Sequence, residues 1–292
     1  MTLGACAAPL CEAYDTALLD LDGVVYTGDA AIPGAVEAIA AARAAGMRIA
    51  YVTNNASRTP ATVAAHLTAL GIPAAESEVV TAAQAAATLL GTLVPPPGPV
   101  LVTGTEGLRE ALAAAGYASV PAAADRPAAV VQGYDPTLTY ADLTEAALAV
   151  RAGAVWVACN LDATIPSERG QLPGNGALVA FVAHAVGRRP DAAAGKPERA
   201  LHHEAVRRSG AVRPLVVGDR LDTDVEGAAR AGCDSLLVLT GVTDEAALLA
   251  APEGRRPTYV GLDLRTLLLP HPADGVRDGL DALRGVLRTT WV

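Results

Sequence analysis

The chain has few aromatic residues, a single lysine and no long uninterrupted apolar run. Aromatic residues make up 3% of its 292 positions, and its formal net charge is −9. Nucleic-acid-binding proteins instead present a basic face, and those that bind single strands add aromatic rings for stacking. We therefore expect no nucleic-acid partner. Arg, Asp or Glu interrupts every apolar stretch before it reaches membrane-spanning length, so we expect a soluble, cytoplasmic protein with no membrane partner.

The four cysteines have neither the paired spacing of a metal site nor the density of a disulfide framework. Cys6 ends the segment Leu3-Gly4-Ala5-Cys6, which has the form of a lipidation box. Only two residues precede this segment, so it lacks the charged and apolar regions of a secretion signal. We interpret residues 1–15 as a disordered leader.

Positive charge in this chain is carried almost entirely by arginine. Of the 22 lysines and arginines, only Lys196 is a lysine. Arginine is a planar fork, whereas lysine is a compact point charge on a thin stem, so a site can require one and exclude the other. This favours a functional role for Lys196 over the chance survival of a surface lysine.

Strand and helix patterns alternate near both ends of the chain. Hydrophobic residues make up 51% of the sequence, which is ample for a core. Residues 16–19 form an apolar run that predicts a buried strand, 34–45 a helix ended by Gly46, and 48–52 a second strand. A late segment repeats the alternation, with a helix at 197–209, a strand at 214–217, a helix at 223–231 and a strand at 235–239. This pattern predicts an α/β fold with a doubly wound parallel sheet.

A segment of domain size with its own α/β rhythm separates the two halves. Its predicted strands cover 100–103, 129–132 and 155–158, and its predicted helices cover 107–115, 140–152 and 177–186. Turn-forming residues mark both ends, Pro95-Pro96-Pro97-Gly98 at the start and 187–190 at the end. We predict a core split between residues 16–85 and 187–292, with a second domain of residues 86–186 inserted in it.

Two aspartates follow the first predicted strand. In an extended segment, residues two apart face the same way, so Asp20 and Asp22 point into one space. Open α/β sheets bind their ligands at this end of the strands. Two carboxylates so close repel unless a cation or a shared proton relieves them, and Mg²⁺ is the usual cation beside phosphate. An Asx turn at the strand end is the structural alternative.

Three further strand-end segments carry polar groups of the same kind. Thr53-Asn54-Asn55 offers a hydroxyl and successive backbone N–H groups to a phosphate oxygen, although a capped turn has the same residues. Lys196 precedes a helix and could balance negative charge. After the strand at 214–217, Asp219 suits a metal. Of the two acids beyond it, we favour Asp224 over Asp222 for a water-mediated metal role, while both also suit a helix N-terminus.

These segments together resemble the four motifs of the haloacid dehalogenase superfamily. The resemblance covers residues 15 to 268 and includes Val52-Thr53-Asn54-Asn55-Ala56-Ser57-Arg58 and Leu172-Pro173-Gly174-Asn175-Gly176. The insert resembles the cap of the type IIA (C2) subgroup, which contains nitrophenyl, phosphoglycolate, glycerol-3-phosphate, pyridoxal-phosphate and nucleotide phosphatases. The resemblance therefore implies a Rossmann-like core with a C2-type cap, and an enzyme that hydrolyses phosphate monoesters.

The resemblance also implies roles for individual residues. Asp20 would attack phosphorus and form an aspartyl-phosphate, and Asp22 would act as general acid and then as general base. Mg²⁺ would be held by the Asp20 carboxylate, the Asp22 backbone carbonyl and Asp219. Phosphate oxygens would be bound by Thr53 and Lys196, assisted by the Asn54 amide.

The inserted domain would close as a lid and determine substrate choice. Because its few aromatic residues are poorly suited to stacking on a ring, we expect a small aliphatic phosphate such as glycerol 3-phosphate or 2-phosphoglycolate, ahead of nucleotides and pyridoxal phosphate. By analogy with relatives, a homodimer through the cap is expected. The candidate specificity residues are Asn160, Asp162, Gly174, Asn175 and Gly176. Asn160 is equally suited to a turn after a strand, and for the two glycines tight-turn geometry is favoured over substrate contact.

Three alternatives compete with a phosphatase. A signalling receiver also carries an aspartyl-phosphate, but it is shorter, orders its acids differently and has no inserted domain. A catalytically idle phospho-ligand-binding relative is disfavoured because every catalytic position is filled, and phosphotransfer to an acceptor alcohol is the closest enzymatic alternative.

The pair His202-His203 could suggest a metal site. Adjacent helical residues point about 100° apart, however, so a solvated helix face is expected.

Overall fold

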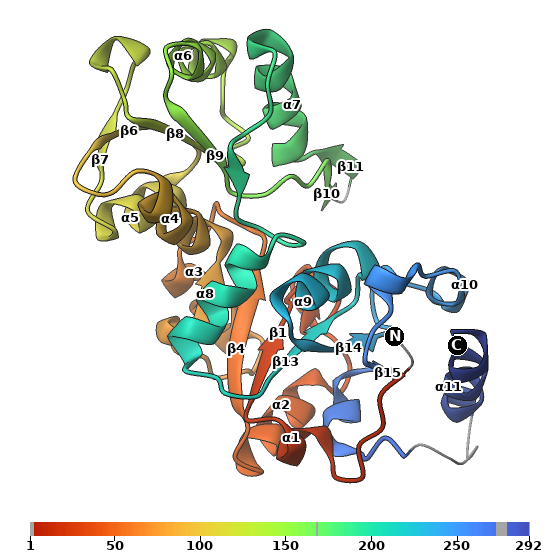
Figure 1. Ribbon diagram of the computed structural model, residues 1–292. Helices are drawn as coiled ribbons and strands as arrows, with labels where there is room; N and C mark the ends of the chain where they lie inside the picture. Colours follow the sequence, from red (N-terminus) through yellow and green to blue (C-terminus); the bar gives the residue numbers. More distant parts are fainter. Residues whose placement is uncertain (1–2, 168, 273–278, 292) are drawn as a thin grey trace. The chain divides into compact units, whose positions relative to one another are not determined.

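The computed structural model describes residues 3–167, 169–272 and 279–291 (Figure 1). The chain forms two compact units. The first unit contains residues 1–52, 64–79 and 205–292, and the second contains residues 53–63 and 80–204. Each unit is built around a parallel sheet, as the alternation of strands and helices in the sequence predicts.

The first sheet has six strands in the order β15-β14-β13-β1-β4-β5. Central strand β1 runs parallel to β13 on one side and to β4 on the other. All four residues of β1 are buried, as expected for a strand covered on both faces. The strands are β1 (Thr16–Leu19), β4 (Arg48–Thr53), β5 (Val79–Thr81), β13 (Pro214–Gly218), β14 (Asp234–Val238) and β15 (Tyr259–Gly261).

The helices around this sheet begin and end close to their predicted limits. Gly46, which was expected to end the first long helix, has φ +95°. The helix expected at 223–231 differs, because a π-helical turn, η3 (Leu221–Val225), precedes its α-helical part. The helical elements are α1 (Leu10–Ala13), α2 (Ala35–Ala44), α3 (Pro60–Ala69), η1 (Glu76–Glu78), α8 (Arg199–Ser209), α9 (Glu226–Ala231), α10 (Glu245–Leu249), η4 (Glu253–Arg255), η5 (Leu264–Leu268) and α11 (Gly279–Thr290), and the short strands β2 (Tyr26–Thr27) and β3 (Ala30–Ala31) form a hairpin.

The expected disordered leader is wrong for residues 3–15, which pack on the first unit. Leu3 and Leu10 are buried. The Gly4 N–H donates to the Thr258 carbonyl at 2.7 Å, and Cys6 pairs with His271 in an isolated β-bridge. The partners of this segment lie more than 200 residues further along the chain, so local composition could not reveal them.

The second sheet has five strands in the order β12-β9-β8-β6-β7, and its hydrogen-bonded neighbours are parallel. Because β12 pairs with β9, this unit extends beyond residue 186, where we expected the inserted domain to end. An antiparallel hairpin precedes its last helix. The elements are α4 (Ala82–Leu93), β6 (Pro99–Thr103), α5 (Glu106–Ala114), β7 (Ala118–Val120), η2 (Ala123–Asp125), β8 (Ala129–Gln132), α6 (Tyr140–Arg151), β9 (Val155–Ala158), β10 (Thr164–Ser167), β11 (Gly170–Pro173), α7 (Asn175–Val186) and β12 (Ala192–Ala193).

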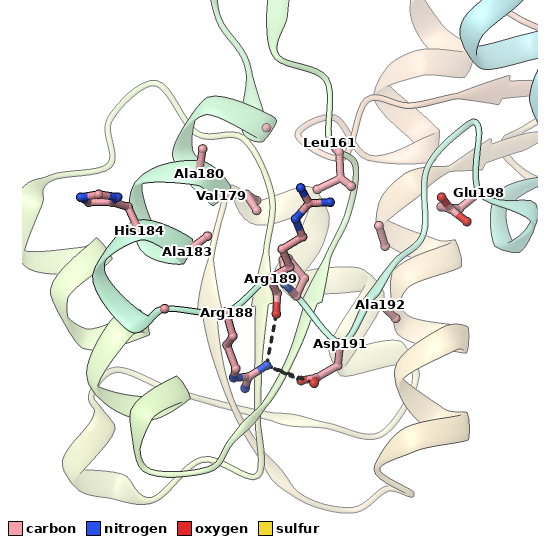
Figure 2. Close-up of a pocket in the computed structure, with 14 residues that line it drawn as sticks. Leu161, Val179, Ala180, Ala183, His184, Arg188, Arg189, Asp191, Ala192 and Glu198 are labelled. Atoms are coloured by element: carbon pink, nitrogen blue, oxygen red, sulfur yellow. Dashed lines mark hydrogen bonds and ion pairs between the residues drawn. The ribbon is translucent and has the colours of Figure 1, made fainter.

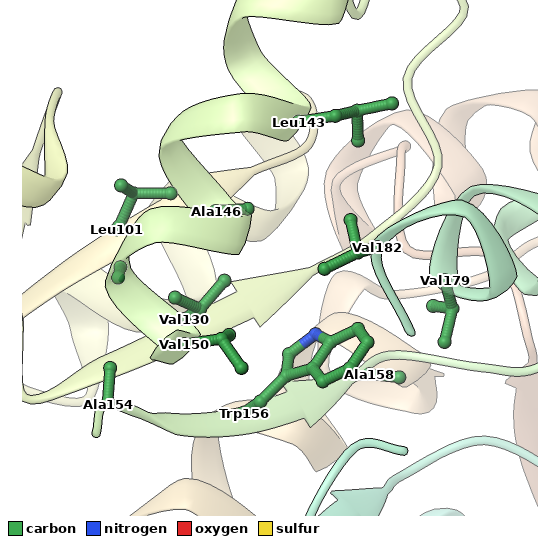
Figure 3. Close-up of a cluster of buried hydrophobic side chains, with 11 residues drawn as sticks. Leu101, Val130, Leu143, Ala146, Val150, Ala154, Trp156, Ala158, Val179 and Val182 are labelled. Carbon is green, nitrogen blue, oxygen red and sulfur yellow. The ribbon is translucent and has the colours of Figure 1, made fainter. Parts of the chain in front are cut away.

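The core of the second unit lies between its sheet and helices α6 and α7 (Figure 3). Trp156 of β9 is fully buried there, in one cluster with the strand residue Val130 and the helix residues Val150 and Val182. The Trp156 indole N–H donates to Gln132 Oε1 at 3.1 Å, which satisfies the one polar atom that the ring brings into the core.

Among the residues that the structure describes, no helix is both long enough and apolar enough to cross a bilayer.

The chain beyond residue 268 belongs to the first unit. Leu287 and Trp291 are buried with Leu237, Leu248 and Val260 in one hydrophobic cluster. The Arg284 guanidinium donates to the Val260 carbonyl at 3.0 Å. Helix α11 therefore completes the core beside β14 and β15.

Replacing Trp291 with Ala should lower the free energy of unfolding by about 3 kcal/mol, because it removes a large ring from a packed cluster. Urea unfolding followed by circular dichroism measures this. Val286 of α11, the helix that precedes Trp291, is 50% exposed, so Val286→Ala is the matched control and should change stability little. Equal effects of the two substitutions would contradict a structural role for the buried Trp291 ring.

Candidate active site

Three carboxylates lie together in the first unit. Asp20 follows β1, Asp219 follows β13, and Asp224 lies in η3. Each offers an oxygen, and the three oxygens lie within 4.8 Å of one another. The Asp20 N–H donates to the Val217 carbonyl at 2.8 Å, so pairing of β1 with β13 continues up to the first acid. The carboxyl ends of two neighbouring parallel strands thus bring Asp20 and Asp219 together, as the sequence predicted.

Backbone groups fix the orientation of the Asp219 carboxylate. The Val242 N–H donates to Asp219 Oδ2 at 2.7 Å, and the Thr243 N–H donates to the Asp219 carbonyl at 3.1 Å. A Cβ at Gly241 would overlap Asp219 Oδ2, and one at Gly23 would lie 2.6 Å from the same oxygen. Gly23 also has φ +81°. Glycine is therefore required at both positions for the backbone to approach this carboxylate.

Asp224 and Asp222 have different environments. Asp224 is buried, and its carboxylate accepts a hydrogen bond from the Arg220 N–H at 3.1 Å. Asp222 instead forms a bidentate pair with the Arg220 guanidinium, at 3.0 and 2.9 Å. Burial opposes ionisation of Asp222, but these bonds outweigh it and lower the pKa of its carboxyl. Of these two acids, Asp224 alone belongs to the carboxylate cluster. The side chain of Asp22, the other acid expected at the site, is exposed.

The donor set of this cluster fits a divalent cation. Three carboxylates this close repel one another, and a cation between them removes the repulsion. All three donors are hard oxygens, the ligands that Mg²⁺ prefers, and two of them are fixed by backbone contacts. Asp20, Asp219 and Asp224 are therefore the residues that would hold Mg²⁺, with Asp224 close enough for direct or water-mediated binding.

The second unit brings together Thr53, Asn54 and Lys196. Thr53, the last residue of β4, is buried, and its hydroxyl accepts a hydrogen bond from the Asn55 N–H at 3.1 Å. Asn54 Oδ1 accepts from the Lys196 N–H at 2.7 Å, and Asn54 Nδ2 donates to the Lys196 carbonyl at 3.1 Å. Asn54 Nδ2 also donates to the carboxylate of Asp162, at 3.1 and 3.2 Å.

The structure does not support substrate contact by the side chains of Asn160 and Asn175. They are 5% and 1% exposed. Asn160 Nδ2 donates to the Asn54 carbonyl at 2.8 Å, and Asn175 Nδ2 donates to the carbonyls of Asn160 and Gln132 at 2.8 and 3.2 Å. These amides satisfy buried backbone groups, so the expectation that they select the substrate is corrected. Asp162, which is half-buried, remains a candidate.

Gly174 and Gly176 have a steric role at the start of α7. A Cβ at Gly174 would overlap the Asp162 carbonyl, and a Cβ at Gly176 would overlap the Leu161 carbonyl. The N–H of Gly176 donates to the Asp162 carbonyl at 2.8 Å. Of the alternatives considered for these glycines, the structure therefore supports close backbone packing.

Comparison with known proteins identifies the family. The model described as haloacid dehalogenase-like hydrolase matches residues 17–118, and a second, HAD-hydrolase-like model matches residues 193–267. The D-glycerol 3-phosphate phosphatase of Mycobacterium tuberculosis is 51% identical over 258 residues, which are 88% of this chain and 72% of that protein. The chain belongs to the haloacid dehalogenase-like hydrolases.

Solved structures of this hydrolase family have the same fold. A glycerol phosphate phosphatase from Mycobacterium tuberculosis, in complex with magnesium, superposes with a TM-score of 0.92 at 45% identity, over 97% of this chain and 92% of that one. The p-nitrophenyl phosphatase from Archaeoglobus fulgidus gives a TM-score of 0.80 at 31% identity, over 87% and 98% of the two chains. Within the family, this hydrolase is a phosphoric monoester hydrolase of the type IIA subgroup.

A groove of about 740 Å³ in the second unit is lined by none of the four strand-end motifs (Figure 2). Helix α7 lines it with Val179 and Ala183, and the segment before β12 adds Arg188 and Asp191, which form an ion pair at 3.0 Å. Among the described residues that line it, Gly176 alone was a sequence candidate for the site. This groove is therefore not the candidate active site of the hydrolase.

The expectation of a solvated face at His202-His203 holds only for His203. His202 of α8 is 1% exposed, because it lies on the same buried stripe of the helix as Ala205. Burial, together with the positive charge of Lys196, lowers the pKa of His202 to about 3. The apolar residues Ala205 and Val206 follow His202 at the helical spacings of three and four, and this was the signal in the sequence that could have indicated burial.

Replacing Gly241 with Ala should weaken Mg²⁺ binding about tenfold, because the new methyl group must displace the Asp219 carboxylate. The Mg²⁺ concentration for half-maximal activity measures this. A Cβ at Gly254 meets nothing within 4 Å, so Gly254→Ala is the matched control. Unchanged Mg²⁺ dependence of the Gly241→Ala variant would contradict the geometry described for Asp219.

The buried His202 should make folding stability depend on pH. Because the pKa of His202 is lowered to about 3 from 6.5, the unfolded chain binds a proton between these values that the folded chain does not. Above pH 6.5 neither state binds this proton, and stability does not depend on it. Between pH 6.5 and pH 3 the free energy of unfolding falls by about 1.4 kcal/mol for each unit by which the pH is lowered.

Urea unfolding of the wild type and of His202→Leu between about pH 6 and pH 4 tests this. We expect a shallower decline for the His202→Leu variant than for the wild type. Parallel curves for the two proteins would show that His202 does not titrate as described.

Proposed function

We propose that this enzyme hydrolyses small aliphatic phosphate monoesters, with glycerol 3-phosphate and 2-phosphoglycolate as the favoured substrates and Mg²⁺ as the cofactor. The observation that carries the chemistry is the cluster of Asp20, Asp219 and Asp224, whose carboxylate oxygens lie within 4.8 Å of one another. A cation-binding acid cluster that includes a strand-end aspartate is suited to phosphoryl transfer.

Asp20 is the nucleophile in this mechanism. Its carboxylate oxygen forms a bond to phosphorus as the bond from phosphorus to the ester oxygen breaks, which leaves an aspartyl-phosphate and an alkoxide. Asp22 donates a proton to that alkoxide and then takes a proton from the water that hydrolyses the aspartyl-phosphate. The exposed Asp22 side chain is able to exchange protons with solvent between turnovers. Mg²⁺, when bound, offsets negative charge on the phosphoryl group.

Thr53 and Lys196 bind the oxygens of the same phosphoryl group. The hydroxyl of Thr53 donates one hydrogen bond, and the ammonium of Lys196 supplies positive charge to a dianionic ester. Such local charge allows a chain with a net charge of −9 to accept an anionic substrate, because net charge does not describe the field inside a site.

The substrate proposal rests on similarity and composition. The 51% identical relative is a D-glycerol 3-phosphate phosphatase. A 5′-nucleotidase of Bacillus subtilis is 37% identical over 89% of this chain, which makes nucleotides a second candidate. The low aromatic content disfavours stacking on a base, and Asp162 is the half-buried polar side chain we propose for contact with the leaving group.

The inserted unit is proposed to act as the cap that excludes water during the reaction. A homodimer formed through this unit and a cytoplasmic location also belong to the proposal. They rest on analogy with capped relatives and on composition.

The purified protein should release phosphate from glycerol 3-phosphate and 2-phosphoglycolate faster than from a nucleoside monophosphate or pyridoxal phosphate. Chelation of divalent cations should abolish release, and added Mg²⁺ should restore it. Asp20→Asn should lower kcat by at least about a thousandfold, because it removes the nucleophile.

Asp222→Asn is the matched control, since Asp222 pairs with Arg220 outside the carboxylate cluster. It should keep most of the activity. Full activity of Asp20→Asn, or no turnover by the wild type on the whole panel, would refute the mechanism. A preference for nucleotides would refute the substrate class alone.

A further inference from the structure

The side-chain amide of Asn54 forms hydrogen bonds with both polar backbone groups of Lys196, the only lysine in the chain. Asn54 Oδ1 accepts from the Lys196 N–H at 2.7 Å, and Asn54 Nδ2 donates to the Lys196 carbonyl at 3.1 Å. These are the two hydrogen bonds that a neighbouring β-strand would make with a residue. The Asn54 side chain therefore fixes the Lys196 backbone in the way that strand pairing would.

The donors of this amide are fully used within the second unit. A carboxamide has two N–H hydrogens. One serves the Lys196 carbonyl, and the other serves the Asp162 carboxylate, whose two oxygens lie 3.1 and 3.2 Å from Nδ2. The side chain of Asn54 therefore has no hydrogen left for a phosphate oxygen, which was the role expected from the sequence.

Asn54 is itself held by a row of buried amides. Its carbonyl accepts from Asn160 Nδ2 at 2.8 Å, and the Asn160 carbonyl accepts from Asn175 Nδ2 at 2.8 Å. Asn175 Nδ2 also donates to the carbonyl of Gln132, the last residue of β8. Asn160, Asn175 and Gln132 are at most 5% exposed, so water competes little for these bonds.

Gly195 makes the close approach sterically possible. A Cβ at this position would lie 2.8 Å from Asn54 Oδ1 and 2.8 Å from Asn160 Cβ. The Gly195 N–H donates to the Cys159 carbonyl at 2.7 Å, directly after β9. The backbone leading into Lys196 is thus bonded at Gly195 to the residue that follows β9 and at Lys196 to the Asn54 side chain.

The neighbouring Asn55 shows that this arrangement is specific to Asn54. Its Oδ1 accepts from the Ser57 N–H at 2.7 Å and the Arg58 N–H at 3.1 Å, so it forms a local turn. Two adjacent asparagines of one motif therefore have different tasks.

We propose that Asn54 is a positioning residue, which acts through Lys196 and does not bind phosphate with its side chain. This inference rests on the proposed role of Lys196 in binding phosphate. A lysine ammonium stands on a flexible stem of four carbons, so it is placed accurately only if the backbone of the residue is fixed. Lys196 is 4% exposed, which leaves its side chain little freedom once the backbone is in place.

The single lysine allows a direct test that needs no activity. Amine modification by a small reagent, followed by mass spectrometry, reports on Lys196 separately from the N-terminal amine. In Asn54→Ala we expect Lys196 to react at least about tenfold faster than in the wild type, because its backbone is released. A Lys196 as protected as in the wild type would overturn the proposal.

Val182→Ala controls for general loosening of the second unit. Val182 is fully buried in the core that contains Trp156, and it has no place in the row of amides. This variant should lose stability and yet keep Lys196 protected. Equal exposure of Lys196 in both variants would show that any destabilisation has the same effect, and that Asn54 has no specific role.

A double-mutant cycle separates positioning from direct contact. Asn54→Ala should lower kcat/KM about thirtyfold in the wild type but less than twofold in the Lys196→Met background, because it acts only through the lysine. Additive losses would mean that Asn54 contacts the substrate independently. An inactive wild type would refute the proposed function, and the modification rates would still decide the role of Asn54.

Discussion

Mutual repulsion of three carboxylates is the constraint on which the candidate active site depends. The oxygens of Asp20, Asp219 and Asp224 lie within 4.8 Å of one another, a distance at which like charges oppose folding unless a cation binds. The first unit opposes this repulsion with covalent and hydrogen-bonded geometry. Adjacent parallel strands end at two of the acids, and a π-helical turn presents the third. Gly23 and Gly241 allow the backbone to close around Asp219, and the Val242 N–H holds one oxygen of its carboxylate.

The polar network of the second unit is built mainly from neutral groups. Its polar row consists of the side-chain amides of Asn54, Asn160 and Asn175, which are bonded mainly to backbone carbonyls, the last of them that of Gln132. Burying an amide with its partners costs much less than burying a charge. The unit thereby connects a strand end to the segment of Lys196 through neutral side chains. The low pKa of His202 keeps the imidazole neutral, so it does not repel the lysine.

Errors in the sequence interpretation share one cause, which is that burial is a property of the whole chain. Asn160 comes soon after a strand and Asn175 lies between two glycines, and both settings are typical of binding loops. Both side chains are nevertheless buried and form hydrogen bonds with backbone groups. His202 was expected in solvent, although it lies on the inward stripe of its helix. Leu3 and Leu10 were assigned to a disordered leader because the residues they pack against lie far along the chain. In each case the local residues were compatible with both outcomes.

The sequence by itself determined the fold class and the identity of the strand-end residues. Alternating apolar runs and helix patterns specify a parallel sheet, and strands such as Thr16–Leu19 were predicted to the residue. Because parallel strands place their carboxyl ends at one edge, the proximity of Asp20 and Asp219 also followed from the sequence. Only the tertiary structure placed Asp224 in the carboxylate cluster and Asp222 against Arg220, and only the tertiary structure showed that the Asn54 amide is bonded to the Lys196 backbone. Both distinctions depend on which partner lies within hydrogen-bonding distance, and such distances are set by packing that the local sequence does not specify.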